Sequence, residues 1–132
     1  MNIYIIIAIL AVHWLADFLL QTDWQAQNKS SNIKALLEHT VTYSWVWFFV
    51  VLFYLIIQYN AFEFYKILIC VFVSIYFTIT TFICHTITDY FTSRLNKKLW
   101  EEKKVHWFFV SIGFDQLLHY IQLLITYKLI FM

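Results

Sequence analysis

The sequence lacks proline, and it has one glycine and two cysteines in 132 residues. Proline and glycine are the usual breakers of helices, so their scarcity allows long uninterrupted helices. Cys70 and Cys84 lie in the same apolar stretch and do not form a Cys-x-x-Cys motif. The cysteines therefore give no support to a fold held together by disulfides.

Charge is also scarce, because charged residues make up 13% of the chain, against about 25% in a typical soluble domain. Hydrophobic residues make up 62% and aromatic residues 22%. A water-soluble fold of this length could not bury that much apolar surface. The net charge of +1 gives no broad basic surface for nucleic acid. The composition predicts a helical membrane protein with one domain, residues 1–132, and membrane lipid as its surroundings.

Four apolar segments predict transmembrane helices, at about residues 3–22, 40–58, 62–92 and 105–131. Each is long enough to cross a hydrocarbon core about 30 Å thick at about 1.5 Å per residue. The first has no basic segment before it and no small-residue cleavage site, so we interpret it as a retained helix. The predicted fold class is all-α, a transmembrane four-helix bundle.

The polar connectors at residues 23–38 and 93–104 hold most of the basic residues, and we expect the second to be a charged loop. These residues are Lys29, Lys34, Arg94, Lys97, Lys98, Lys103 and Lys104. The positive-inside rule then places both connectors in the cytoplasm and both termini on the non-cytoplasmic side of the cell inner membrane. The basic residues are interpreted as a topology signal in contact with lipid headgroups.

Three histidine–aspartate pairs stand inside the apolar segments, each with a spacing of four residues. They are His13 with Asp17, His85 with Asp89, and Asp115 with His119. Side chains four residues apart project from one face of a helix. The order reverses in the last pair, whose helix runs the opposite way, so every pair places its aspartate nearer the cytoplasm and its histidine about 6 Å deeper. His39 begins the second predicted helix on the same side, where it could cap the cluster.

These side chains predict a metal site. An isolated aspartate at a helix centre costs about 2.5–3.5 kcal/mol, and three aspartates close together repel one another unless a cation neutralises them. Histidine and carboxylate together suit Zn²⁺, with Mn²⁺, Fe²⁺, Co²⁺ and Ni²⁺ as alternatives. The predicted ligands are His13, Asp17, His39, His85, Asp89, Asp115 and His119. Seven ligands exceed the need of one tetrahedral ion, so either two ions share them or some of them orient the others.

Several alternatives stay open. The polar residues could form a metal-free network between helices, or histidines could bind haem. A metal-dependent hydrolase acting on a lipid or membrane-associated substrate from the cytoplasmic leaflet is the preferred function, with Asp89 or Asp115 accepting a proton from bound water. A transporter or channel for transition-metal ions or protons is the second function, and a structural protein stapled by its metal the third. A homo-oligomer is also left open.

Four blocks carry a resemblance to a known family: "HWLADFLLQTDWQAQNK", "LLEHTVTY", "CHTITDYFTSRLNKK" and "GFDQLLHYIQL". In this order they resemble domain-of-unknown-function family three-three-zero-seven, small membrane proteins of bacteria and their phages. The resemblance covers nearly the whole chain and implies that the seven predicted ligands are the family's hallmark positions. More loosely, the chain is similar to membrane-bound metal-dependent hydrolases, which share intramembrane histidine and aspartate motifs.

Overall fold

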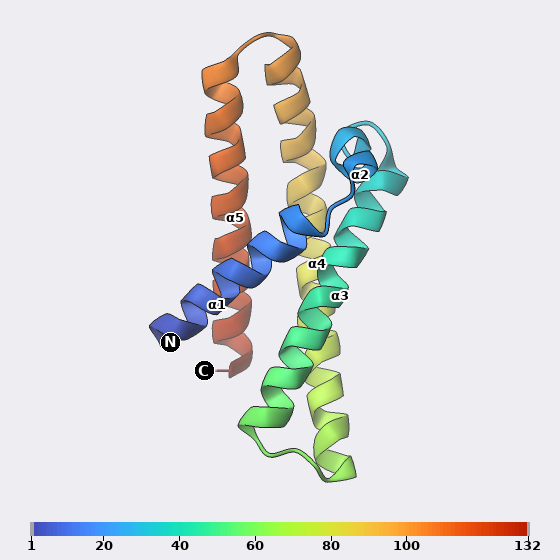
Figure 1. The fold of residues 1–132 in the computed structure, drawn as a ribbon, viewed down its shortest axis with the longest axis vertical. Helices are drawn as coiled ribbons and strands as arrows, with labels where there is room; N and C mark the ends of the chain where they lie inside the picture. Colours follow the sequence, from blue (N-terminus) through green and yellow to red (C-terminus); the bar gives the residue numbers. More distant parts are fainter. Residues whose placement is uncertain (1, 132) are drawn as a thin grey trace.

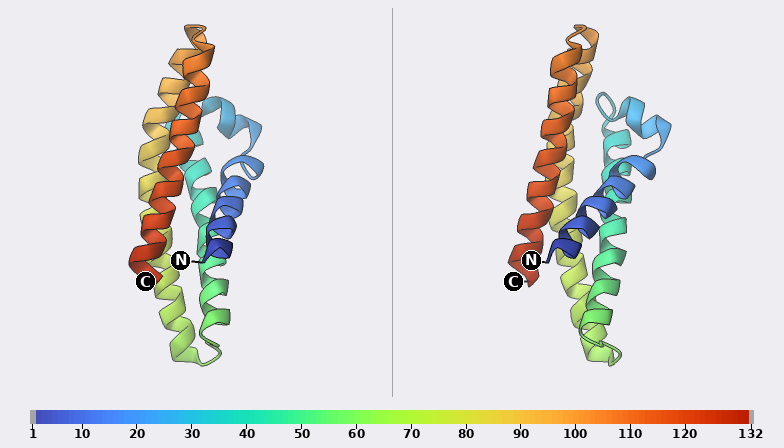
Figure 2. Two further views of the ribbon diagram at one scale, coloured as in Figure 1. Left: turned by 90° about the vertical axis from the view of Figure 1, so that its left-hand side faces the viewer. Right: turned by 60° about the vertical axis from the view of Figure 1, so that its left-hand side comes forward.

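The computed structural model describes residues 2–131 and is all-α in that range, without strands (Figure 1). The elements in chain order are α1 (Ile3–Trp14), the π-helical turn η1 (Leu15–Leu19), α2 (Asp23–Asn28), α3 (Ile33–Gln58), α4 (Phe64–Glu101) and α5 (Val105–Phe131). α3 and α5 both pack along α4, whereas α1 runs obliquely across the bundle and contacts α5 (Figures 1 and 2). The predicted all-α class is confirmed.

The two hairpins point to opposite ends of an elongated molecule (Figure 1). The α4–α5 turn at residues 102–104 and the short helix α2 lie towards one end, which we call the basic end because the lysines of both connectors gather there. The α3–α4 turn at residues 59–63 lies at the opposite end, and the start of α1 and the end of α5 lie in that half of the molecule.

The helices α3, α4 and α5 are each long and apolar enough to cross a membrane. The N-terminal apolar helix is shorter, because α1 and η1 together run from Ile3 to Leu19. At about 1.5 Å per residue this segment is about 25 Å long, less than a hydrocarbon core of about 30 Å. The predicted first helix, residues 3–22, ends early because Thr22 caps a new helix: its side chain accepts from the Gln25 backbone N–H, and the Gln25 side chain accepts from the Thr22 N–H.

Two long helices extend further into the connectors than predicted. α3 begins at Ile33 rather than near residue 40, because the Asn32 side chain accepts a hydrogen bond from the backbone N–H of Lys34 and caps the helix. The predicted charged loop at residues 93–104 is wrong for most of its length, since α4 continues to Glu101.

Helix-forming residues explain why α4 continues. The segment has no glycine or proline, and its lysines pair with glutamates one turn later: Lys97 lies 4.0 Å from Glu101, and Lys98 lies 3.9 Å from Glu102. The helix ends where Lys103 adopts a positive φ of 57° and the Lys104 N–H donates to the Leu99 carbonyl at 2.9 Å, which is a Schellman-type C-cap. Charge alone therefore did not break the helix.

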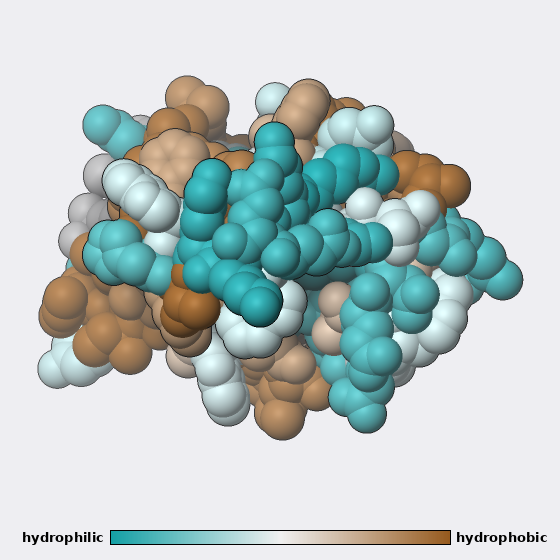
Figure 3. All heavy atoms as spheres, turned by 90° about the horizontal axis from the view of Figure 1, so that it is seen from above, coloured by the Kyte–Doolittle hydropathy of each residue, from teal (hydrophilic) through white to brown (hydrophobic). Residues whose placement is uncertain are grey.

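The interior contains a layer of polar side chains beside an apolar core, and many large apolar side chains face outwards. The apolar core includes Trp47, Phe77 and Leu123, each at most 2% exposed, whereas outward side chains such as Phe72 and Tyr76 are 69% and 63% exposed. Seen from the basic end, hydrophilic side chains gather over the centre of the face and extend to its lower right, whereas hydrophobic ones are commonest at its left and lower edges (Figure 3). Exposed aromatic rings around a polar interior suit a chain surrounded by lipid.

Candidate metal centre

The structure brings all seven predicted ligands into one buried cluster, and none of them is more than 8% exposed. They come from five elements: His13 from α1, Asp17 from η1, His39 from α3, His85 and Asp89 from α4, and Asp115 and His119 from α5. Because α4 runs towards the basic end while α3 and α5 run away from it, residues far apart in sequence meet at one level of the bundle.

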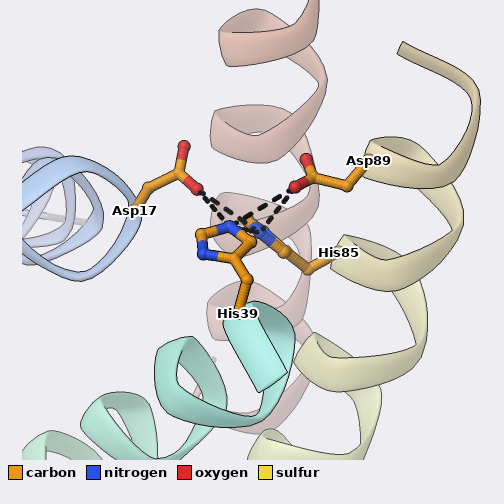
Figure 4. Close-up of side chains that lie close together, drawn as sticks. All are labelled: Asp17, His39, His85 and Asp89. Atoms are coloured by element: carbon orange, nitrogen blue, oxygen red, sulfur yellow. Dashed lines mark hydrogen bonds and ion pairs between the residues drawn. The ribbon is translucent and has the colours of Figure 1, made fainter. Parts of the chain in front are cut away.

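Four of these side chains, Asp17, His39, His85 and Asp89, converge on one point, and we call them the central tetrad (Figure 4). The Nε2 atom of His39 lies 3.1 Å from Oδ1 of Asp17 and 3.3 Å from Oδ2 of Asp89. The Nε2 atom of His85 lies 3.4 Å and 3.6 Å from the same two oxygens. The two Nε2 atoms are 3.2 Å apart.

These distances match the edges of a tetrahedral ligand set. Ligand atoms about 2.0–2.1 Å from a Zn²⁺ ion at tetrahedral angles lie about 3.3 Å from one another. Hydrogen bonds alone explain the arrangement less well, because each Nε2 carries at most one proton, whereas three ligand atoms lie within 3.6 Å of it. A cation at the centre would give all four donor atoms a partner.

The charge of the cluster leads to the same conclusion. When ionised, Asp17, Asp89 and Asp115 carry three negative charges, and Lys29 beside Asp89 carries one positive charge. Three minus one leaves two uncompensated negative charges among side chains that are nearly excluded from solvent. Buried charges without partners are costly. One divalent cation would cancel them, and the charge of a second one would be offset by a bound hydroxide or another anion.

The π-helical turn places Asp17. In η1 the Leu20 N–H donates to the Leu15 carbonyl at 3.0 Å, five residues back instead of four. Such widened turns are rare and occur frequently at functional sites. The turn holds the Asp17 carboxylate against His39 and His85, although the sequence predicts ordinary α-helix here.

A second group of donors adjoins the tetrad through Asp89. Its other oxygen, Oδ1, lies 3.5 Å from Nε2 of His119, and Nδ1 of His119 lies 3.7 Å from Oδ2 of Asp115. Neither ring nitrogen of His119 has a hydrogen-bond partner among the described residues, although the side chain is only 1% exposed. Unpaired buried polar atoms are destabilising, so His119 is available to bind an ion together with Asp89 and Asp115.

His13 has a different environment, because hydrogen bonds engage both of its ring nitrogens. Nδ1 lies 2.7 Å from the Tyr43 hydroxyl, and Nε2 lies 2.9 Å from Oε1 of Gln116. The amide nitrogen of Gln116 donates to Asp17 and to Asp115, each at 3.1 Å. His13 is close enough to Asp17 and His119 to share an ion, but its contacts in this structure position Gln116 between two carboxylates.

Sequence reasoning missed Lys29 as part of the site and assigned it only to membrane topology. Its ammonium group donates to Oδ2 of Asp89 at 2.8 Å, and its side chain is 20% exposed. Burial alone would lower the pKa of Lys29, but the carboxylates of Asp89 and Asp17 outweigh it and raise that pKa, so the group stays charged. A sequence signal was present, since Lys29 is the only lysine or arginine in the first resembling block.

Two further contacts hold predicted ligands in place, and sequence reasoning did not identify them. The Tyr43 ring stacks on the His85 ring with centroids 3.9 Å apart. The Thr92 hydroxyl donates to Oδ1 of Asp115 at 2.6 Å. Helical spacing could have identified both, because Tyr43 follows His39 by four residues and Thr92 follows Asp89 by three.

Comparison with known proteins gives one match. A family model described as "Protein of unknown function (DUF3307)" matches residues 5–132. Because the match covers nearly the whole chain, the chain belongs to this family. No curated protein and no solved structure matches the chain.

Proposed function

We propose that this member of the DUF3307 family is an integral protein of the cell inner membrane, and that it is a metal-dependent hydrolase acting on a lipid or membrane-associated substrate from the cytoplasmic leaflet. The spacing of the donor atoms in the central tetrad carries this proposal. The basic end faces the cytoplasm in this proposal, because most lysines and the arginine lie there.

The two groups of donors suit two ions with different roles, and Zn²⁺ is the ion that fits their chemistry best. The tetrad offers four protein donors, the number found in closed structural sites. The second group offers three, which leaves a position for water or substrate as in catalytic sites. Asp89 belongs to both groups and would bridge them, with Oδ2 towards the tetrad and Oδ1 towards His119.

The residues around the second group support hydrolysis. A divalent ion there would lower the pKa of its bound water to about 7. Asp115 is the better proton acceptor of the two predicted carboxylates, because Asp89 is already engaged by Lys29 and the tetrad. Asp115 would contact the ion through one carboxylate oxygen and accept the water proton on the other; the water oxygen would add to the ester, and the proton would pass to the leaving oxygen as its bond breaks. Thr92 and Gln116 hold Asp115 in place.

The alternative functions receive less support. A transporter needs polar groups along its whole path, but the cavity between the cluster and the opposite end is lined by apolar side chains such as Ile9, Val51 and Phe77. A purely structural role fits the closed tetrad, but it leaves the three donors of the second group without a purpose.

The test is elemental analysis of the detergent-purified full chain. We expect about two Zn²⁺ ions per chain, and loss of the tetrad ion in His39→Ala and in His85→Ala. His106→Ala is the matched control, because His106 is exposed and lies outside the cluster. A wild-type chain without stoichiometric metal, or tetrad variants that keep all of it, would contradict the proposal.

A further inference from the structure

Two cavities flank the metal cluster along the bundle axis, and the first is apolar. It has a volume of about 230 Å³ and lies between α1, α3, α4 and α5 on the side of the opposite end. Val12, Trp47, Phe77 and Tyr127 line it. Trp47 in its wall lies 6.4 Å, centroid to centroid, from Tyr43, whose ring stacks on His85, so one aromatic ring separates this wall from the cluster. We call it the apolar cavity.

The second cavity is a groove of about 630 Å³ at the basic end, between the α2 region and the α4–α5 hairpin. Its polar lining includes Lys29, Ser30, Ser93, Asn96 and Lys97, and we call it the polar groove. Glu101 also lines it, at 4.0 Å from Lys97.

One observation in the polar groove indicates a ligand. The Ser93 hydroxyl is buried, with the residue 8% exposed, and has no hydrogen-bond partner among the described residues. A buried hydroxyl without a partner is costly. Lys29 and Lys97 line the same groove, and a hydroxyl with two ammonium groups is a set of donors that suits an anion such as phosphate. Lys29 also contacts Asp89, so the groove ends at the cluster.

The order along α4 relates the three compartments to one another. Ser93 lines the polar groove, Asp89 belongs to the cluster and Phe77 lines the apolar cavity. At about 1.5 Å per residue, Ser93 lies about 6 Å from Asp89 on one side, and Phe77 lies about 18 Å away on the other. An anionic site at the basic end, a reactive centre and an apolar site deeper in the bundle thus follow one another.

We infer that the molecule on which this centre acts is a phosphate-bearing lipid, an inference that rests on the proposed function. Its phosphate lies in the polar groove beside Lys29, Lys97 and Ser93, and an alkyl chain lies in the apolar cavity. A lipid of the leaflet at the basic end already has this orientation, with its phosphate at the membrane surface and its chains towards the midplane. The bond that faces the cluster is then one between phosphate and chain.

The experiment measures lipid binding to the full chain, loaded with Zn²⁺ in a neutral detergent, by native mass spectrometry. The probes are oleoyl lysophosphatidic acid, monooleoylglycerol with the same chain but no phosphate, and inorganic phosphate. We expect one lysophosphatidic acid per chain, bound about tenfold or more tightly than either other probe, since each charge-assisted hydrogen bond contributes roughly that factor. If monooleoylglycerol binds equally well, the phosphate is not recognised and that part of the inference is wrong. If inorganic phosphate binds equally well, the alkyl chain is not recognised and that part is wrong.

Paired variants separate the two cavities. Lys97→Met should weaken lysophosphatidic acid about tenfold and leave monooleoylglycerol unchanged, while Lys98→Met, whose side chain is 72% exposed and outside the groove, should change neither. Ala8→Trp fills the apolar cavity and should weaken both lipids, whereas its outward-facing neighbour Ile7→Trp should weaken neither. Variants that bind like their controls would overturn the assigned positions.

Metal content is measured on the same samples, so the two proposals fail separately. A chain with its metal that does not prefer lysophosphatidic acid overturns the lipid inference and leaves the metal centre in place. A chain that never binds metal overturns the proposed function, and with it the claim that a bound lipid is a substrate.

Discussion

Asp89 links the central tetrad to the second group of donors. One of its oxygens belongs to the tetrad and accepts from Lys29, and the other faces His119. A single carboxylate therefore connects a lysine from a connector, the tetrad and the second group. Substitutions at its partners should consequently have separable effects.

The first prediction concerns Lys29. In metal-free protein, Lys29→Met leaves the buried Asp89 carboxylate without its ion-pair partner, which should lower the free energy of unfolding by about 3–5 kcal/mol. Zn²⁺ should recover part of this loss, because a ligand that binds the folded state stabilises it. Thermal unfolding in detergent, with and without Zn²⁺, measures both effects.

Lys34→Met is the control for that prediction, since the Lys34 side chain is 75% exposed and pairs with the exposed Glu38. It should change the free energy of unfolding by no more than about 0.5 kcal/mol. An equal loss of unfolding free energy in both variants would show that Lys29 does not stabilise the buried Asp89 carboxylate.

The second prediction concerns His119, whose two ring nitrogens have no hydrogen-bond partner within residues 2–131. His119→Ala should reduce the metal content from about two ions per chain to about one, because the tetrad keeps its four donors. Elemental analysis measures the change. If His119→Ala retains both ions, the second group does not hold one.

Helical spacing predicted much of the site at this scale. Each histidine–aspartate pair lies on one helix face, and antiparallel helices bring the pairs to one level. Lys29 could not be placed in this way, because it lies between two helices, outside any periodic pattern, and reaches Asp89 only through the packing of the α2 region against α4.

At the scale of elements, the helices themselves were easier to predict than their ends. Long apolar runs without proline indicate helices, and three of the four are long spans. The ends depend on local capping by Asn32 and Thr22 and on helix propensity in a charged segment. The π-helical turn that places Asp17 leaves no signal in the hydrophobic pattern.

The third prediction tests the end of α4. Lys103 has a positive φ, which costs a residue with a side chain about 1–2 kcal/mol, so Lys103→Gly should raise the free energy of unfolding by about 1 kcal/mol. Lys98→Gly, inside the helix, should lower it by about 1 kcal/mol. Chemical unfolding in detergent compares the two. Changes of the same sign would contradict the assigned helix end.

At the scale of the whole molecule, the hairpins give the bundle two chemically different ends. The basic end has the polar groove and most lysines, whereas the opposite end has Glu63 in the α3–α4 turn and Lys66 in the first turn of α4. The direction of the protein in the membrane should follow this difference.

The fourth prediction is the orientation. In a chain with Cys70→Ala and Cys84→Ala, a membrane-impermeant maleimide added to intact cells should label Glu63→Cys and not Lys98→Cys. After the membrane is permeabilised, both should be labelled, because both positions are exposed. Labelling of Lys98→Cys alone in intact cells would show that the protein has the opposite orientation.

The cluster collects its donors from nearly the full length of the chain, from His13 near the start to His119 near the end. Under the proposed function, a nascent polypeptide that has not yet inserted α5 lacks two of the seven donors, Asp115 and His119. We therefore expect metal to bind only after α5 is in place, and cells starved of the ion to accumulate an inserted but less stable form that proteases remove.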